Sequence, residues 1–272
     1  SWQIRHRLGL AYARRGQTVE AEGAFGEATR LAPYKPQPHL NLARIHAHAG
    51  RVEAARTERM LFERWTPVED EVRRHEQEIR QSPNSSEARY RLGQAYVEQG
   101  RLAEALARFR QAVELDTTYA RAYYGIGAVL HLRGDIREAI LSYEKAARLA
   151  PDMVPLLADL GQAYHQTGQY GESIASFRKA LQLREDLPLT WGKLGVTYAQ
   201  SGRLEEAIQA YSTALRQDST LVDVRSGLAG AYAATGRLGA AIKQWRAVLR
   251  QVPRYPRVAD LIRTAERELG RG

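Results

Sequence analysis

Apolar residues recur at helical spacing in stretches of about 14 residues, and short polar or glycine-containing breaks separate these stretches. The segment from Pro188 is a clear example, in which Ala199-Gln200-Ser201-Gly202 closes one helical stretch before another begins. A glycine at such a break is typical of a helix end that needs the left-handed conformation. The pattern therefore predicts an all-α protein built from pairs of helices.

The pattern has a period of 34 residues, and five consecutive units follow it closely. Each has a Leu-Gly pair or a close variant in its first helix, a glycine after that helix, and a small residue and an aromatic residue in the second helix. The aromatic residues are Phe109, Tyr143, Phe177, Tyr211 and Trp245. Glycine inside a helix costs about 1 kcal/mol relative to alanine. We expect the first-helix glycine to be tolerated because it lets an aromatic partner approach closely.

These positions resemble the tetratricopeptide repeat (TPR), whose signature is W-x2-L-G-x2-Y, then A-x3-F, then P. The unit from Pro188 carries Trp191, Leu194, Gly195, Tyr198, Ala207 and Tyr211 at those places. Two further units, from Trp2 and from Pro36, precede the regular five. The resemblance covers nearly the whole chain and implies an α-solenoid of seven TPR repeats in a right-handed superhelix.

The second unit departs from the period. Arg59 stands at its aromatic position, and the next clear unit starts at Ser86, which leaves 16 additional residues. Within them, Thr66-Pro67-Val68-Glu69 has the features of a helix start: a capping Thr, Pro at the first helical position and Glu three residues after the cap. The segment forms either a separate inserted helix or a kinked extension of the preceding helix. Both interpretations place a joint at residues 66–85.

We therefore expect four parts: TPR repeats 1 and 2 at residues 2–69, an inserted helix or joint at 70–85, repeats 3–7 at 86–255, and a capping helix at 256–272. The capping helix has an apolar side that would close the last core face. That side is formed by Val258, Leu261, Ile262, Ala265 and Leu269. The first helix has no such cap, which suggests that another segment precedes it in the full protein.

In the family that the sequence resembles, the first helix of each pair lines a concave groove, and fixed repeat positions face the ligand. Transfer of those positions implies a groove for a peptide or a partner protein. Its candidate residues are Arg7, Asn41, Arg44, Tyr90, Arg91, Gln94, Tyr124, His131, Gln162 and His165. The family's clamp for terminal carboxylates is matched only in part, by Asn41 and Arg44, and the asparagine ladder of sugar-transferase repeats is absent. Neither of those two specific functions is expected.

Two pairs of candidate residues allow two interpretations each. Tyr90 and Tyr124 share one repeat position, so they either form a platform for a peptide or pack between neighbouring first helices. His131 and His165 also share a position and are either solvated or a metal-binding or pH-sensitive pair. We expect no metal, because no carboxylate or cysteine stands at ligand spacing.

Three further in-helix glycines exceed what the repeat requires: Gly192, Gly227 and Gly230. They either allow close approach of a ligand backbone or reflect drift at undemanding positions. Replacement by alanine separates these interpretations, because drift predicts a more stable protein with unchanged binding.

Composition adds exclusions. The 272 residues contain no cysteine, which excludes a disulfide scaffold, a zinc finger and a cysteine nucleophile. The net charge of +9 is concentrated in the seventh repeat and, less strongly, in the first, so no continuous nucleic-acid-binding stripe is predicted. Lys243, Arg246 and Arg250 share one face of a second helix, and form either a docking patch for an acidic partner or a solvated convex face.

No glycine-rich phosphate loop, metal constellation or nucleophile with a base is found, so we expect neither an enzyme nor a cofactor. No apolar run approaches the roughly 18 residues that span a bilayer, and no targeting segment is found, so a soluble chain is expected. The favoured function is a non-enzymatic scaffold for a protein or peptide partner, preferably an acidic or C-terminally carboxylated one. The alternatives are a recruiting segment of a larger enzyme or secretion machine and, less favoured, an RNA-binding helical repeat.

Overall fold

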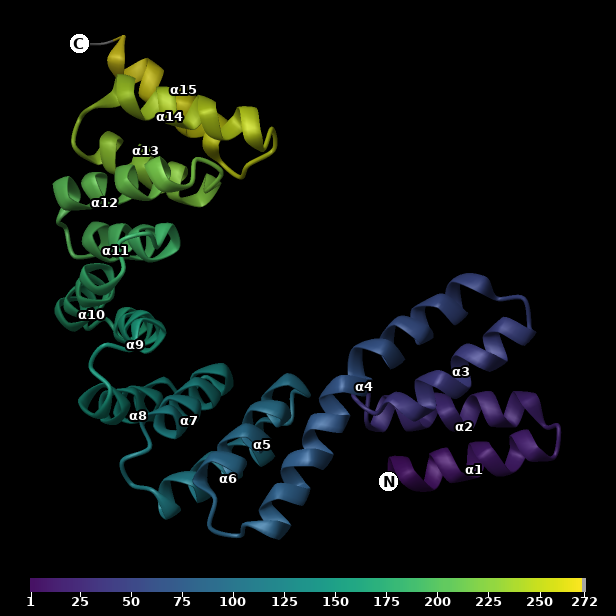
Figure 1. The fold of residues 1–272 in the computed structure, drawn as a ribbon. Coiled ribbons are helices and arrows are strands. Elements are labelled where there is room, and N and C mark those ends of the chain that lie inside the picture. The colour runs from purple at the N-terminus through teal and green to yellow at the C-terminus, as the bar shows by residue number, and fades with distance from the viewer. Residues whose placement is uncertain (271–272) are drawn as a thin grey trace. The chain divides into compact units, whose positions relative to one another are not determined.

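The computed structural model describes residues 1–270, which form fifteen helices and no strand (Figure 1). The helices are α1 (Trp2–Arg14), α2 (Thr18–Leu31), α3 (Pro36–His48), α4 (Val52–Gln81), α5 (Ser86–Glu98), α6 (Leu102–Leu115), α7 (Ala120–Arg133), α8 (Ile136–Leu149), α9 (Val154–Gln166), α10 (Tyr170–Leu183), α11 (Pro188–Gln200), α12 (Leu204–Gln217), α13 (Val222–Ala234), α14 (Leu238–Gln251) and α15 (Val258–Leu269). The protein is an all-α solenoid of seven helix pairs with a final helix. Among the described residues, no helix is both long enough and apolar enough to cross a membrane.

The chain divides into two compact units, Ser1–Gly125 and Ile126–Gly272, which we call the first and second units. The first unit has a core cluster in its first repeats that contains Phe25 and Leu42. The second unit contains two larger clusters, one extending from Ile174 to Ala231 and one from Ala229 to Ala265. The boundary between the units falls within α7, and the four-part division expected from the sequence stays a prediction.

A glycine follows each of the seven first helices, and its φ is positive in every repeat, between 69° and 86°. These glycines are Gly16, Gly50, Gly100, Gly134, Gly168, Gly202 and Gly236. A side chain at such a φ clashes with the backbone, so glycine is the residue that ends these helices without strain. The predicted left-handed helix ends are therefore confirmed.

The first-helix glycines allow close contact with aromatic rings. A Cβ atom added to Gly93 would lie 2.6 Å from Phe109 Cε1, and one added to Gly127 would lie 2.5 Å from Tyr143 Cδ1. Both distances are shorter than atoms in contact can adopt, so the ring occupies the space that a side chain would need. The predicted interlock of glycine and aromatic residue is confirmed in these helix pairs.

Residues 66–81 belong to the 30-residue helix α4 rather than to a separate helix. Thr66 does not cap a helix start: its hydroxyl donates a hydrogen bond to the Phe62 carbonyl at 2.7 Å, and Pro67 lies inside the helix. The prediction that a helix begins at Thr66 is therefore wrong, and the structure has the predicted alternative, an extension of the preceding helix. Figure 1 shows α4 as one long ribbon that leads from α3 to α5.

The first half of α4 lacks the apolar face that other second helices present to the next repeat. In α12 that face contains Ile208 and Tyr211, which are both buried. At the corresponding places, four and seven residues after the first residue of the helix, α4 has Arg56 and Arg59, and both are exposed. This charged face explains why the next first helix, α5, contacts Glu76 in the second half of α4 instead, because burying unpaired charges would be costly.

The second half of α4 resembles a second helix without a first helix of its own. Val72 and His75 are buried and stand at the places that Ile208 and Tyr211 occupy in α12. The places that face a repeat's own first helix, filled by buried alanines in α12, are Glu71 and Glu78 in α4. This half therefore packs on α5, the next first helix, and leaves the position of the missing helix open.

A buried ion pair fixes this second half. Lys35 Nζ lies 2.7 and 2.8 Å from the two carboxylate oxygens of Glu69, and Gln99 Nε2 donates to the same carboxylate at 3.3 Å. The Lys35 ammonium also lies 5.4 Å from the centre of the Trp2 ring. Lys35 precedes α3 and Gln99 follows α5, so Glu69 connects repeats on both sides of the 16 additional residues.

The last helix caps the core with fewer residues than its sequence indicates. Val258 and Ala265 are buried against the last core cluster, and Ile262 packs beside them. Leu261 is 42% exposed and Leu269 is 57% exposed, so the prediction that they help to close the core is wrong. The helix begins at Val258, and residues 271–272 of the predicted cap lie outside the described residues.

The three additional in-helix glycines are not equivalent. A Cβ atom on Gly192 would lie 2.7 Å from Val224 Cγ2, and one on Gly227 would lie 2.9 Å from Tyr211 Cζ. Nothing lies within 4 Å of a Cβ atom on Gly230. Gly192 and Gly227 are therefore required by packing between helices, whereas Gly230 is not.

We expect Gly230→Ala to raise the free energy of unfolding by about 0.5–1 kcal/mol, because alanine loses less backbone entropy in a helix. Gly192→Ala is the matched control in the neighbouring repeat and lowers stability, because the methyl group meets Val224. Thermal and denaturant unfolding of both variants measures the two effects. A shift of the same sign for both would contradict this assignment.

Candidate protein-binding surface

A hydrogen bond joins the first helices of repeats 1 and 2. Asn41 Nδ2 donates to His6 Nε2 at 3.0 Å, and the imidazole ring of His6 lies 6.1 Å from Trp2 and 5.6 Å from Phe25. Burial lowers the pKa of His6 below its ordinary value, which favours the neutral ring that accepts this hydrogen bond. The predicted residue Asn41 is thus held by a neighbour on α1.

Arg7 and Arg44 lie on the same two helices, α1 and α3. Both side chains are exposed, and neither forms an ion pair with any residue in the described range 1–270. An arginine without an acidic neighbour can still form two parallel hydrogen bonds with a carboxylate. The first helices of repeats 1 and 2, which carry His6 and Asn41, therefore also present two cationic groups without an acidic partner in the described range.

The open position beside α4 and α5 forms a polar cavity of about 320 Å³. It is lined by Glu71, Arg74 and His75 of α4 and by Arg91, Gln94, Ala95 and Glu98 of α5. The structure thus brings together two predicted groove residues, Arg91 and Gln94. The 34-residue period did not indicate the side chains that α4 contributes, because residues 66–85 do not follow that period.

A signal for those α4 residues is present in the sequence. The stretch 68–81 has the same length as α2, and it ends before Ser82-Pro83 as α2 ends before Ala32-Pro33. If residues 68–81 are aligned with the second helix of a repeat, Glu71 and Arg74 fall on the side that would face the first helix of that repeat, which is absent here.

Tyr90 packs between aromatic rings at the start of repeat 3. Its ring centre lies 5.6 Å from Phe109 and 5.4 Å from Tyr119, with Tyr119 approaching edge-on. The hydroxyl of Tyr119 donates to Glu87, which also accepts from Arg91 Nε at 2.6 Å. This geometry is what the packing interpretation predicts for Tyr90. A role in binding stays a prediction for Tyr90 and for the half-buried Tyr124.

In the second unit, the candidate histidines have separate surroundings. The ring of His131 packs edge-on against Tyr143, with 6.3 Å between ring centres. His165 Nδ1 lies 3.0 Å from the Thr197 hydroxyl, and its ring lies 5.8 Å from Tyr170. Gln162 is half-buried on α9. No group of three or more His, Asp or Glu residues that could hold a metal ion occurs in the described part of the chain.

The helix pairs, their left-handed glycines and their interlocked rings agree with two family models. Residues 65–263, more than half of the chain, match the model described as the Cilia and flagella-associated protein 70 C-terminal domain, and residues 6–59 match the tetratricopeptide repeat model. The chain belongs to the tetratricopeptide repeat family. Membership supports a general role in protein binding for this TPR protein.

Solved TPR structures have the same fold. The structure of YrrB, described as a TPR protein with an unusual peptide-binding site, is 23% identical, covers 71% of this chain and 97% of its own, and has a TM-score of 0.65. MamA from Desulfovibrio magneticus RS-1 is 17% identical over 61% of this chain and 94% of its own, with a TM-score of 0.58. The C-terminal part of a TPR protein from Cytophaga hutchinsonii is 18% identical, covers 94% of this chain and 99% of its own, and has a TM-score of 0.56. A search of the curated proteins gave no match.

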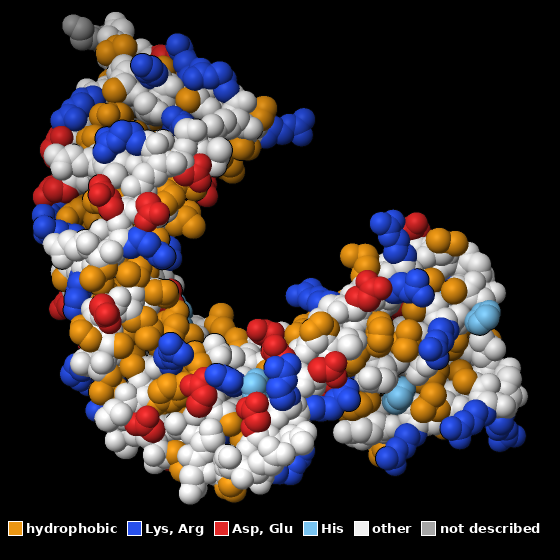
Figure 2. All heavy atoms as spheres, viewed as in Figure 1, with side chains coloured by type: hydrophobic (Ala, Val, Ile, Leu, Met, Phe, Trp, Pro, Cys, Tyr) orange, Lys and Arg blue, Asp and Glu red, His pale blue; other side chains and the backbone are white. Residues whose placement is uncertain are grey.

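Charge on the TPR surface is mixed. In the view of Figure 2, Lys and Arg side chains are interspersed with Asp and Glu side chains, and no continuous basic stripe crosses the visible face. In the seventh repeat, Arg246 of the predicted basic patch pairs with Glu266 of α15 at 2.7 Å. The last helix therefore partly neutralises that patch.

His165 gives this TPR protein a pH-dependent contribution to stability. Burial lowers its pKa below 6.5, so the unfolded chain binds this proton more tightly than the folded chain does. The contribution of His165 to the free energy of unfolding is therefore fully present above pH 6.5. It decreases as the pH falls below 6.5 towards the lowered pKa of the folded protein. NMR titration of the imidazole in the folded protein, compared with the protein in urea, measures the shift. A folded-state pKa at or above the unfolded value would contradict this expectation.

Proposed function

We propose that this TPR protein is a non-enzymatic scaffold that binds an acidic peptide segment of a partner protein on the first helices of its first unit. The observation that carries the proposal is the pair of exposed arginines, Arg7 and Arg44, which have no acidic partner among residues 1–270 and belong to the two helices that the Asn41–His6 hydrogen bond joins. A partner carboxylate, from a side chain or a C-terminus, would complete these interactions.

The cavity between α4 and α5 supports an extended ligand rather than a single carboxylate. Its charges are balanced, because Arg74 and Arg91 are accompanied by Glu71 and Glu98. The Gln94 amide adds a donor and an acceptor that suit a peptide backbone. The partner segment is therefore expected to be acidic where it meets α1 and α3 and polar without net charge where it meets α5. Participation of Tyr124, His131, Gln162 and His165 is part of the wider prediction for the first helices.

The test uses a library of random peptides with a free C-terminal carboxylate, selected on the wild-type protein. Affinities of selected peptides are then measured for the wild type and for Arg7→Ala/Arg44→Ala. The matched control is Arg30→Ala/Arg56→Ala, which removes two exposed arginines, without an ion pair to any described residue, from the second helices of the same repeats. We expect binding to weaken by about tenfold or more in the first variant and to change little in the control.

Salt supplies an independent measurement. Raising NaCl from about 0.05 M to about 0.5 M lowers the affinity of the wild type for the peptide, because exposed charges are screened. The difference in affinity between the wild type and Arg7→Ala/Arg44→Ala therefore becomes smaller. Unchanged affinity in Arg7→Ala/Arg44→Ala, or an equal loss in the control, would contradict the proposal.

A further inference from the structure

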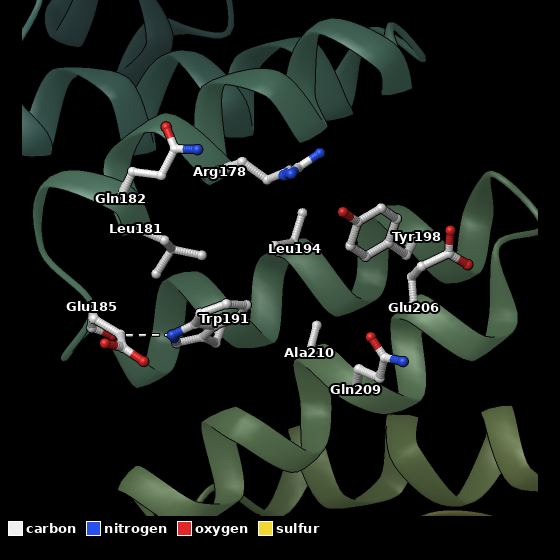
Figure 3. Close-up of a pocket in the computed structure, with 10 residues that line it drawn as sticks. All are labelled: Arg178, Leu181, Gln182, Glu185, Trp191, Leu194, Tyr198, Glu206, Gln209 and Ala210. Atoms are coloured by element: carbon white, nitrogen blue, oxygen red, sulfur yellow. Dashed lines mark hydrogen bonds between the residues drawn. The ribbon is translucent and has the colours of Figure 1, made fainter.

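A second cavity, of about 400 Å³, opens in the second unit between the second helices α10 and α12, with α11 as its floor (Figure 3). We call it the α10–α12 cavity. It is lined by Arg178, Leu181, Gln182, Glu185, Trp191, Leu194, Tyr198, Glu206, Gln209 and Ala210. The α11 residues that line it are spaced three and four apart and so share one side of the helix, whereas Gly192, whose Cβ would meet Val224 of the next first helix α13, lies on the opposite side. The cavity is therefore separate from the first-helix face.

The floor and wall of the cavity are apolar and fixed. Leu194 is 1% exposed and Ala210 is 2% exposed. The indole of Trp191 donates from Nε1 to the Glu185 backbone carbonyl at 3.0 Å, and the same carbonyl accepts from Gln217 Nε2 at 2.9 Å. These two hydrogen bonds hold the loop after α10 and the indole ring in place, so the cavity exists before any ligand binds.

The edge of the cavity offers one free cation. Arg178 is exposed and forms no ion pair within residues 1–270, whereas Glu206 is paired with Arg203 Nη2 at 2.8 Å. The hydrogen bond from Arg203 lowers the pKa of Glu206, which keeps that pair charged and mutually neutralised. In Figure 3, Arg178 and Tyr198 lie at one end of the cavity, and Glu185 lies at the other end beside Trp191.

The corresponding place in repeat 3 is polar. There the cavity is lined by Glu76, Ile79, Arg80, Leu92 and Arg108. Arg108 stands at the position that Ala210 has in α12, seven residues into the second helix. A long charged side chain thus replaces the methyl group that leaves room in repeat 6.

The corresponding places in repeats 5 and 7 are occupied by internal hydrogen bonds. In repeat 7, Arg225 and Gln244 stand where repeat 6 has Trp191 and Ala210, and Arg225 Nη1 donates to Gln244 Oε1 at 3.2 Å. In repeat 5, Glu144 stands where Arg178 stands, and it accepts from the Tyr164 hydroxyl at 2.7 Å. Repeat 6 therefore combines an indole wall, an alanine and a free arginine, and this combination leaves both apolar and cationic surface for a ligand.

We propose that the α10–α12 cavity is a second binding site, which receives an aromatic side chain of a partner protein whose adjacent carboxylate pairs with Arg178. The volume is sufficient for one such side chain, and apolar pockets with a few placed polar groups are the usual form of ligand sites. The ring would pack on Trp191 and Leu194, and Arg178 would bind the carboxylate with two parallel hydrogen bonds. This site shares no residue with the arginines of the proposed function, so the two can fail separately.

The probe is N-acetyl-L-phenylalanine, which carries one aromatic ring and one carboxylate. Binding is followed by the NMR signal of the Trp191 indole N–H, assigned with Trp191→Phe. We expect a saturable shift with a Kd of about 1–10 mM, as suits so small a ligand. N-acetyl-L-phenylalaninamide, which lacks the carboxylate, binds more weakly by about threefold or more.

Two variants test the two parts of the site. Ala210→Arg introduces the residue that repeat 3 has at this position, and it abolishes the shift by filling the cavity. Arg178→Ala alters an exposed side chain, so it leaves folding intact and removes the preference for the carboxylate over the amide. A helical circular-dichroism spectrum like that of the wild type shows that each variant is folded.

Three results would overturn the proposal. The Trp191 signal does not respond to the probe, all indole signals respond equally, or Arg178→Ala keeps the preference for the carboxylate over the amide. If Ala210→Arg does not fold, the proposal is still tested by Arg178→Ala, because that variant leaves the buried position 210 unchanged.

Discussion

Lys35→Met lowers the free energy of unfolding of the first unit by about 3–5 kcal/mol, because it leaves the Glu69 carboxylate buried without its cation. Both side chains are nearly enclosed, with 13% of Lys35 and 11% of Glu69 exposed. Among residues 1–270, the Gln99 amide is the one remaining group within hydrogen-bonding distance of the carboxylate. Hydrogen exchange of the α4 and α5 amides measures the change, since helix pairs in a solenoid can open separately.

Two further variants isolate the buried charge. Arg5→Ala removes an exposed ion pair with Glu27 on α1 and α2, and it should change exchange little. Lys35→Met/Glu69→Gln removes both charges and keeps an amide for Gln99, so most of the lost stability should return. If Lys35→Met costs no more than Arg5→Ala, the ion pair does not fix the second half of α4.

Phe109→Ala has a comparable effect, a loss of about 3–5 kcal/mol from the stability of the first unit. The Phe109 ring is 2% exposed, and it occupies the space next to Gly93 of α5 and Gly125 of α7. Its removal leaves a cavity between three helices and also removes a ring neighbour of Tyr90. Hydrogen exchange of α5 and α6 measures the loss, and Leu115→Ala, at a 42% exposed position of α6, is the matched control.

A double-mutant cycle tests the contact between glycine and ring directly. Gly93→Ala alone destabilises, because its Cβ atom would lie 2.6 Å from Phe109 Cε1. The same change in a Phe109→Leu background should cost less, because the smaller side chain leaves room for the methyl group. Equal costs in both backgrounds would show that the ring does not require the glycine.

The irregular segment shows why the sequence could not settle α4. Thr66-Pro67-Val68-Glu69 satisfies the local rules for a helix start, and proline inside a helix costs about 3 kcal/mol. The helix nevertheless continues, and Glu69, Val72 and His75 beyond the proline are buried in contacts with other elements. The partners of Glu69 are Lys35 and Gln99, 34 and 30 residues away, so no local pattern reveals them.

Trp191 shows the same limit for a site. Its place in the TPR signature indicates a packing residue, and part of its surface does pack on the core of the second unit. Whether it also lines a cavity depends on Arg178 and Ala210, which belong to the two flanking second helices. The groove residues Arg7, Asn41 and Arg44, by contrast, could be proposed from repeat position alone. The sequence did not predict the hydrogen bond from Asn41 to His6.

The sequence by itself determined the repeat period, the helix pairs, the glycines at the helix ends and the pairing of glycine with aromatic rings. These features depend on backbone conformation at single positions and on contacts that recur at a fixed spacing. The same residue pattern for them therefore recurs from repeat to repeat and can be recognised in the sequence. Only the tertiary structure decided the continuity of α4, the polar cavity beside α5 and the apolar α10–α12 cavity. Those features arise where one repeat differs from its neighbours, and their form depends on side chains from separate helices that fill or leave the same space.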